Sequence, residues 1–458
     1  MDKLQSEYVP ILILVVAIAV VVRRLPRVEI THSDAFRRRR TLNWLPLGLT
    51  YAFLYMGRYN LNGLLDGHLI AKSDWGDIDG VAQLVYGIAF VVNGPLTDRL
   101  GGRFAILVAA AGACACNAGI GISIAVSGHV PGYWLLMCLY CGNMYFQSFG
   151  AVAIVKVNAS WFHLRERGTF GGIFGILISL GIYFAFDWAP KIASLTSLPW
   201  LFLAPAVILG VFFVFDLMWV RNEPSDAGFA DFDVADASSG ETGPPDPALK
   251  IIKRILTNRV ILTIALIALC AGFIRMGLMK WHRVFASGLG TAGNFAAVHW
   301  GMLLCIAGIT GGMFAGTISD HLFHSRRPPV ATVLFSIALV GACSMLVLLG
   351  APASVSWIAA FMLVAILGVH GLLAGVASQD FGGRRNAGTA TGMIDGFVYL
   401  GGALQDFVYG HLLPSGDAAK SSSHWLVWPV AMIPMAVIGL VLSLTIYRAV
   451  VQPRSASH

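Results

Sequence analysis

The chain has 458 residues, of which 57% are hydrophobic and only 12% are charged. Globular proteins carry about 25% charged residues, so this composition excludes a soluble globular protein and indicates an α-helical protein with many membrane spans. The net charge of +7 gathers in loops on one side of these spans, so it is no sign of nucleic-acid binding.

An apolar run, Val9–Val22, opens the chain; its 14 residues would form a helix about 21 Å long, which is short for a membrane span. Arg23, Arg24 and Arg27 follow the run, whereas a signal peptide carries its basic residues in front. We therefore expect an uncleaved thirteenth transmembrane helix with the N-terminus outside. A helix that lies in the membrane interface is the alternative. The basic run Arg37–Arg40 before the next span indicates a cytoplasmic segment.

Twelve longer apolar runs of roughly 17–25 residues follow, the length that a transmembrane helix needs. They lie near 42–65, 79–97, 104–126, 132–160, 169–187, 199–219, 259–285, 294–317, 328–350, 355–379, 388–409 and 425–447. The pattern predicts an all-α polytopic membrane protein. The expected divisions are 1–41 for the extra helix and its basic segment, 42–221 and 251–447 for two six-helix bundles, 222–250 for a cytoplasmic linker, and 448–458 for a cytoplasmic tail.

The positive charges divide these loops into two sets. The loops on the side of the linker carry most of the lysine and arginine residues, whereas the opposite loops carry only Lys72, Lys191 and Lys420. Cytoplasmic loops of membrane proteins are the ones rich in lysine and arginine, so we expect the linker and the C-terminus to be cytoplasmic.

Two arginines are each isolated in an apolar stretch, Arg58 in LTYAFLYMGRYNLNGLL and Arg275 in IALIALCAGFIRMGLM. They occupy matching places in the two halves, and Asp98 and Asp320 repeat at nearly the same interval. An arginine at the bilayer centre costs at least about 2.5–3.5 kcal/mol on insertion scales, so a functional role is the default explanation. One buried cation in each half of a duplicated membrane protein indicates an anion carrier. The alternative is that each arginine pairs with a carboxylate on a neighbouring helix.

The loop between the second and third spans reads GPLTDRLGGR, and a partial copy, GTISDHLFHSRR, occupies the equivalent loop of the second half. Its glycines permit a tight turn across which the charged residues can pair. The element resembles the major facilitator pattern G-x-L-[ST]-D-R-x-G-x-R. The resemblance implies the major facilitator fold, with pseudo-two-fold symmetry between the bundles, and a latch that breaks and remakes during transport. The latch residues would be Gly94, Asp98, Arg99, Arg103 and Asp320.

The surroundings of the arginines are similar to those in the organophosphate:phosphate antiporters, the family of the bacterial glycerol-3-phosphate and hexose-phosphate transporters. The shared features include VYGIAF, FQSFGAVAIVKVNASWF and GTATGMIDGFVYLGG, in the same order and spacing. The resemblance implies that Arg58 and Arg275 bind phosphate. The other residues that it assigns to substrate binding are Tyr51, Tyr55, Asn60, Tyr86, Gln147, Lys156 and Tyr399. Gln147 and Asn60 either donate to the ligand or join neighbouring helices.

The chain departs from that family at several positions. Phe90 and Ile178 stand where the glycerol-phosphate carriers have a lysine and a histidine, and Lys280 replaces an acid. Lys280 and Arg283 lie past Arg275, nearer the outer mouth, where they would either recruit anions or extend to lipid headgroups.

Two acids, Asp395 and Asp406, lie within the eleventh span. They either take up a proton for coupling or form ion pairs with Lys156 or an arginine. We interpret His299 and His370 as packed or helix-bonded residues outside the site.

These observations predict a secondary active transporter of a small organic anion, most simply a phosphate ester exchanged for inorganic phosphate by alternating access. The expected partners are these anions and the lipid bilayer, for a monomer in a bacterial inner membrane with its N-terminus in the periplasm. No nucleophile–base set, metal-ligand spacing or cofactor fingerprint occurs, so we expect no enzyme activity, cofactor or metal. The alternatives are a family-related membrane sensor of a phosphorylated metabolite, and a proton-coupled carrier of a carboxylate or a lysolipid.

Overall fold

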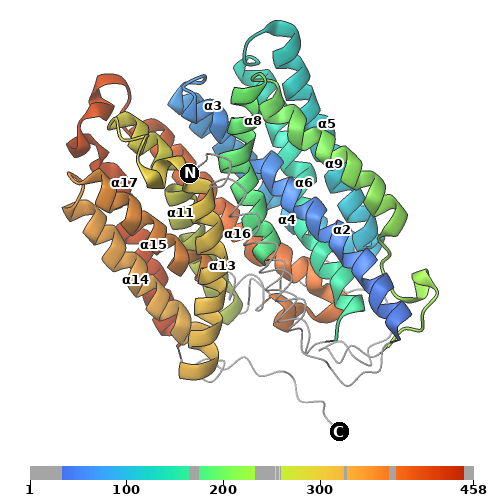
Figure 1. Ribbon diagram of the computed structural model, residues 1–458. Coiled ribbons are helices and arrows are strands. Elements are labelled where there is room, and N and C mark those ends of the chain that lie inside the picture. The colour runs from blue at the N-terminus through green and yellow to red at the C-terminus, as the bar shows by residue number, and fades with distance from the viewer. Residues whose placement is uncertain are drawn as a thin grey trace.

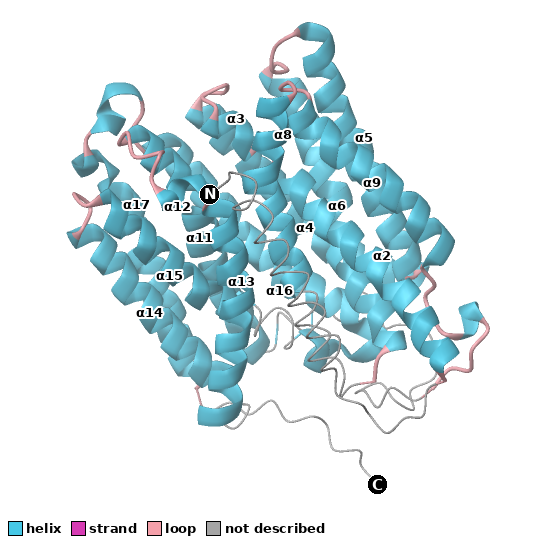
Figure 2. Cartoon of the chain, in the orientation of Figure 1, coloured by secondary structure: helices cyan, strands magenta, loops and turns pink. Residues whose placement is uncertain are grey.

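A computed structural model of the protein describes residues 33–163, 175–232, 259–323, 327–370 and 378–447, together with Lys253 and Thr257. All regular structure in these ranges is helical (Figure 2). The expected helix at Val9–Val22 and the later part of the 222–250 linker lie outside the described residues.

The helices form two groups that stand side by side, the N-terminal half from blue to green and the C-terminal half from yellow to red (Figure 1). The described helices of the first half are α2 (Asp34–Tyr59), α3 (Asn62–Asp66), α4 (Lys72–Leu100), α5 (Gly102–Ser127), α6 (Tyr133–Trp161), a helix over Gly175–Leu195 that contains the π-helical η1 (Phe184–Trp188) and α8 (Ala189–Leu195), and α9 (Trp200–Trp219). Those of the second half are α11 (Arg259–Gly288), α12 (Phe295–Val298), α13 (Trp300–Thr317), the π-helical η3 (Ile318–Leu322), α14 (Arg327–Val347), α15 (Pro352–His370), α16 (Ser378–Leu412) and α17 (Val427–Thr445). Short 3₁₀ turns lie at Ser225–Ala227, Gly416–Lys420 and Ser422–Leu426.

Within the described ranges, nine helices are long and apolar enough to cross a membrane, judged by length and composition. Three further helices, α2, α13 and α16, occupy the places of the remaining expected spans. Of these, α2 and α16 are 26 and 35 residues long but more polar, and α13 has only 18 residues. The described helices therefore match the twelve apolar runs read from the sequence.

The first described helix begins well before the apolar run that predicted it. Ser33 caps α2, because its hydroxyl accepts a hydrogen bond from the Phe36 N–H at 3.2 Å, and Asp34 lies favourably in the first turn. The basic run Arg37–Arg40, which the sequence assigned to a separate segment, therefore belongs to this helix.

The linker end of the molecule is the end where α9 passes into residues 220–232. There Phe36 stacks on Trp161 with 5.8 Å between ring centroids, and Phe229 and Phe232 lie edge-on to Phe36 at 5.5 and 5.9 Å. The first part of the linker is thus packed against the N-terminal half, held by two aromatic residues in an otherwise polar segment. We call the opposite end, which carries α3 and residues 413–426, the far end.

The two halves meet most closely where α4 lies against α16 (Figure 1). Glycines permit this approach. A Cβ atom on Gly76 would lie 2.7 Å from the Gly410 Cα atom, and one on Gly87 would lie 2.9 Å from the Gly396 carbonyl oxygen. Any side chain at these positions would hold the halves apart.

Candidate functional site

Arg58 is fully buried on α2, on the same helix face as Tyr51 and Tyr55. Its guanidinium carbon lies 4.2 Å from the ring centroid of Tyr55, 4.5 Å from that of Tyr86 and 5.6 Å from that of Tyr399. These are cation–π distances. The rings come from α2, α4 and α16, so both halves contribute to the aromatic surroundings of one cation.

The hydrogen bonds of Arg58 leave part of its guanidinium unpaired. Nε donates to Gln147 Oε1 at 3.0 Å, and Nη1 donates to the Tyr399 hydroxyl at 2.5 Å. Nη2 is buried and has no hydrogen-bond partner in the part of the chain that the structure describes, and the same holds for the Tyr86 hydroxyl. The two N–H groups of Nη2 are therefore available to a ligand.

Arg275 reaches the same region from α11 of the other half and is only 3% exposed. Its Nε and Nη2 atoms are buried without a hydrogen-bond partner among the described residues. Arg275 interacts electrostatically with Tyr59, Tyr399 and Tyr55, and the last two also act on Arg58. The two guanidiniums thus share one aromatic environment. Neither guanidinium forms an ion pair among the described contacts, and a buried cation without a paired carboxylate is unfavourable, so this arrangement is suited to accepting an anion.

Side-chain amides form a chain of hydrogen bonds behind Arg58. Gln147 Nε2 and Asn117 Nδ2 each donate to Asn143 Oδ1 at 2.9 Å, and Asn60 Nδ2 donates to Asn117 Oδ1 at 2.8 Å. Gln147 therefore orients Arg58 with its carbonyl oxygen while its amide group binds Asn143. Asn60 joins α2 to α5, which favours its helix-joining interpretation.

Asp395 lies one helical turn before Tyr399 on α16, so both face the arginines. It is half-buried, and its Oδ1 atom has no hydrogen-bond partner among the described residues. Asp395 interacts electrostatically with Arg275 and Arg58 without an ion pair to either among the described contacts. His370, which we expected to lie outside the site, acts on Arg275, and its Nδ1 atom is likewise unpaired within the described ranges.

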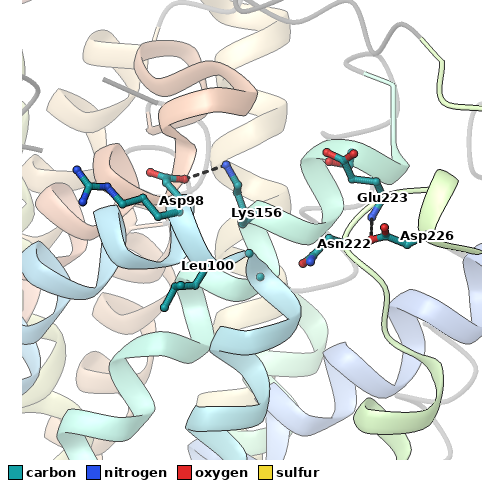
Figure 3. A pocket seen from close by; sticks show the side chains of 10 residues that line it. Asp98, Leu100, Lys156, Asn222, Glu223 and Asp226 are labelled. Carbon is teal, nitrogen blue, oxygen red and sulfur yellow. Dashed lines mark hydrogen bonds and ion pairs between the residues drawn. The ribbon is translucent and has the colours of Figure 1, made fainter. Parts of the chain in front are cut away.

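The structure does not bring Lys156 to the arginines. Lys156 lies nine residues after Gln147 on α6, which corresponds to about 14 Å along the helix. Its Nζ atom lies 3.2 Å from Asp98 Oδ1 at the linker end (Figure 3). Both residues line a pocket of about 350 Å³ whose other lining residues are Arg99, Leu100, Gly101, Gly102, Ser160, Asn222, Glu223 and Asp226.

The residues of the expected latch gather at this linker end. Arg103 anchors the start of α5, because its N–H donates to Asn222 Oδ1 and its Nη2 to the Leu217 carbonyl oxygen, both at 2.8 Å. Gly94 faces Gly392 of α16. The side chain of Asp320 lies outside the described part of the structure.

Our expectation that Lys280 would recruit anions or extend to lipid headgroups was wrong. Its side chain is 1% exposed and forms ion pairs with Asp79 of α4 and, at 3.0 Å, with Asp406 of α16. Asp406 therefore pairs with this lysine, whereas we had considered Lys156 or an arginine as its partner. The error arose because the acids that bind Lys280 lie on other helices, far away in sequence.

Arg283 is also paired rather than free at the outer mouth. Its Nη2 atom lies 2.5 Å from Asp187 Oδ1, and its Nη1 atom lies 3.6 Å from Asp66 Oδ2. Burial raises the pKa of Asp66 to about 6, although the positive charge of Arg283 opposes this shift. The carboxylate of Asp187 also accepts hydrogen bonds from the backbone N–H groups of Gly301 and Met302, both at 2.9 Å, at the start of α13.

Other contacts join the halves at the far end: Lys72 Nζ donates to the Pro414 carbonyl oxygen at 2.6 Å, and His411 Nε2 lies 2.8 Å from Asp77 Oδ1. Within the described residues, every hydrogen bond and ion pair between the halves lies at the far end or at the level of the arginines. The far end of the molecule is therefore closed.

Sequence reasoning missed several residues around the site. Tyr59 continues the four-residue spacing of Tyr51 and Tyr55, so helical periodicity would have found it. Tyr140 donates its hydroxyl to the Arg58 carbonyl oxygen, and Asn143 donates Nδ2 to the Gly57 carbonyl oxygen. Both residues belong to α6, so their spacing in the sequence gives no sign that they contact α2.

Two helical halves that meet around buried cations, with nine helices in the described ranges long and apolar enough to cross a membrane, define a multi-pass membrane protein. The chain belongs to the major facilitator superfamily, since the model of that family matches residues 47–405. This match confirms the expected fold class.

Curated relatives cover most of the chain. The glycerol-3-phosphate transporter of Bacillus subtilis is 25% identical over 83% of this chain and 87% of its own length. The membrane sensor protein UhpC of Salmonella typhimurium is 23% identical over 84% of this chain and 87% of its own length. A probable hexose phosphate transport protein of Chlamydia muridarum is 24% identical, with 89% and 91% covered. They confirm the resemblance to the organophosphate:phosphate antiporter family.

A solved structure has the same fold. It is a bacterial homologue of the human lysosomal transporter Spinster in an inward-facing, unoccupied conformation. The TM-score is 0.65 at 12% identity, and the match covers 93% of this chain and 100% of the other.

Proposed function

We propose that this chain is a secondary active transporter that exchanges a phosphate ester for inorganic phosphate by alternating access around Arg58 and Arg275. One observation carries the proposal: each half supplies a buried guanidinium with N–H groups that have no hydrogen-bond partner among the described residues. Relatives named as glycerol-3-phosphate and hexose phosphate transporters support phosphate as the anion.

The chemistry of the arginines suits a phosphate group. A guanidinium presents a planar fork of donors, stays charged at any physiological pH and matches the oxygens of phosphate in bidentate contacts. A phosphate dianion between Arg58 and Arg275 would offset both charges, and the Tyr86 hydroxyl could donate a further hydrogen bond. The bound anion would draw the halves together, whereas an empty carrier keeps two cations facing one another. This difference favours exchange over one-way transport.

Alternating access then requires the far-end contacts to break while contacts at the linker end form. We propose that Gly94, Asp98, Arg99, Arg103 and Asp320 act as the latch at the linker end. Lys156 would serve there, through its pair with Asp98, and meet the anion only on its way between the centre and the linker end.

The positive-inside rule orients the carrier in the membrane. The basic run Arg37–Arg40 begins α2 at the linker end, and Arg99 and Arg103 lie at the same end. We propose that this end faces the cytoplasm, together with the C-terminus, and that the N-terminus lies in the periplasm of a bacterial cell. The far end would then be the periplasmic gate of a monomeric inner-membrane protein.

The test is counterflow in proteoliposomes loaded with phosphate. Labelled glycerol-3-phosphate, hexose phosphates and a carboxylate are offered outside, for the wild type and for Arg58→Lys and Arg275→Lys. Phosphate-driven uptake of an ester that both variants lose supports the proposal. Arg37→Lys, in the exposed first turns of α2, is the matched control and should transport normally. If only the carboxylate is taken up, the substrate is a carboxylate and the proposal of a phosphate ester is wrong.

A membrane sensor is the second candidate, because relatives named as membrane sensor protein UhpC are as similar to this chain as the named transporters. A sensor needs to bind its ligand without exchanging it. Specific binding of a phosphate ester, lost in Arg58→Lys, with no counterflow of any ester would favour this candidate.

A further inference from the structure

Three ionisable side chains meet between the halves, on the far side of the arginines. Lys280 of α11, Asp79 of α4 and Asp406 of α16 have side chains that are 1%, 3% and 0% exposed. Lys280 Nζ binds the Oδ2 atoms of both acids, that of Asp406 at 3.0 Å. Gln83 Nε2 donates to the same two oxygens, at 3.1 Å for Asp79. Carboxylates from opposite halves thus converge on one ammonium and one amide.

The charges of this cluster do not balance if both carboxylates are ionised, because one lysine faces two acids. The other polar, aromatic and thiol groups that act on it are Tyr59, Trp75, Tyr140, Cys141 and Gln405. None of these supplies a second positive charge. Two carboxylates that share a buried site do not readily ionise together, and an uncompensated buried charge is strongly unfavourable.

We propose that Asp79 and Asp406 form a proton-binding site, which takes up one proton from the far-side water when the far end closes and returns it when the far end opens. In the closed protein the shared proton brings the net charge of the cluster to zero.

Opening separates the partners unequally, because Lys280 and Asp406 belong to the same half. Asp406 keeps its ion pair with Lys280, while Asp79 moves away with α4 into water. Its O–H bond then breaks, the electron pair stays on the carboxylate, and a water molecule on the far side accepts the proton. Closing reverses the step. The proposal holds whichever anion the chain carries.

The closed state binds one more proton than the open state, so acid on the far side favours closure. The equilibrium between the two states then changes by up to tenfold per pH unit, toward opening as the pH rises. The dependence ends at high pH, where the closed state no longer holds the proton.

Other titratable side chains also contact the opposite half at the far end, among them Lys72, which binds the Pro414 carbonyl oxygen, and His68, which lies 3.1 Å from Ser287 Oγ. Two of these contacts contain an acid and need matched controls. His411 pairs with Asp77, and Asp66 lies beside Arg283 with its pKa raised to about 6. Protonation of Asp66 also favours closure in acid, because burial in the closed state raises its pKa and outweighs the opposing charge of Arg283. The side chain of Asp77 is 32% exposed, so water stabilises its charge in either state. The contribution of Asp66 is confined to pH values below about 6, where this carboxyl group binds a proton in the closed state.

The experiment is hydrogen–deuterium exchange of the full-length protein in lipid nanodiscs, between pH 5 and 9. Peptides over residues 60–71 and 283–299 report opening of the far end. The intrinsic rate of amide exchange also changes with pH, so the exchange of Asp79→Asn at the same pH serves as the reference. Asp406→Asn provides a second variant with the same expected effect. Asp77→Asn and Asp66→Asn are matched carboxylate-to-amide controls at the same end.

We expect opening of the wild type to increase with pH, by up to tenfold per unit, relative to Asp79→Asn and to Asp406→Asn. The Asp77→Asn and Asp66→Asn proteins should retain most of this dependence. The proposal is wrong if the wild type and Asp79→Asn open equally at every pH, or if the dependence disappears in Asp77→Asn or Asp66→Asn instead.

Discussion

The role of Gln147 gives a quantitative prediction, because the structure makes it a positioning residue for Arg58. Replacing Gln147 by leucine keeps a similar volume but removes the acceptor 3.0 Å from Arg58 Nε, which leaves a buried charged donor unpaired. Hydrogen bonds to charged groups contribute about 1.5–3 kcal/mol. If that energy orients the guanidinium toward the anion, phosphate affinity should fall by about 10–100-fold, since 1.4 kcal/mol corresponds to tenfold.

Titration calorimetry with inorganic phosphate, together with thermal unfolding, measures this effect. Gln147→Glu separates positioning from stability, because a carboxylate would pair with Arg58, preserve the fold and compete with phosphate. Asn158→Leu is the control: Asn158 is a buried amide on the same helix whose side chain donates to the Ile154 carbonyl oxygen of its own helix. Phosphate binding of wild-type strength in Gln147→Leu and Gln147→Glu would refute the reasoning.

Three further predictions test other parts of the account. Asp395→Asn should raise the affinity for inorganic phosphate about fivefold, because one screened negative charge near the arginines contributes roughly 1 kcal/mol; calorimetry that finds weaker binding would contradict this. Lys280→Met should destabilise the protein by about 3–5 kcal/mol, since it leaves two buried acids without their cation, and an unchanged melting temperature would oppose it. Gly76→Ala should slow exchange without unfolding the protein, because its Cβ atom would meet the Gly410 Cα atom at 2.7 Å, whereas Gly312→Ala, with open space around it, should transport normally.

The fold was largely predictable because membrane spans are apolar runs, and the thickness of the bilayer sets their length. The residues at which the helices begin were harder to predict. Polar residues extend α2 back to Asp34 and α16 back to Ser378, since a helix continues beyond the apolar stretch wherever a cap or an interface stabilises it. The charge of the linker likewise concealed Phe229 and Phe232, which fix its first part on α2.

The two arginines were predictable for a similar reason, since an isolated cation in an apolar run is conspicuous. Their surroundings were predictable only in part. The tyrosines of α2 follow helical spacing, but the pairing of Lys280 with Asp79 depends on which helices face one another. A single sequence does not contain that information. Lys156 was grouped with the arginines through a shared motif, although the helical rise carries it to the linker end.

The central claim is that Arg58 and Arg275 together hold one anion, and calorimetric titration of the purified protein with inorganic phosphate tests it most directly. The account predicts one phosphate bound per chain, with binding lost in both Arg58→Lys and Arg275→Lys and retained in Arg37→Lys, while all of these proteins melt at similar temperatures. Wild-type affinity in either of the first two variants, or two independent sites per chain, would contradict it.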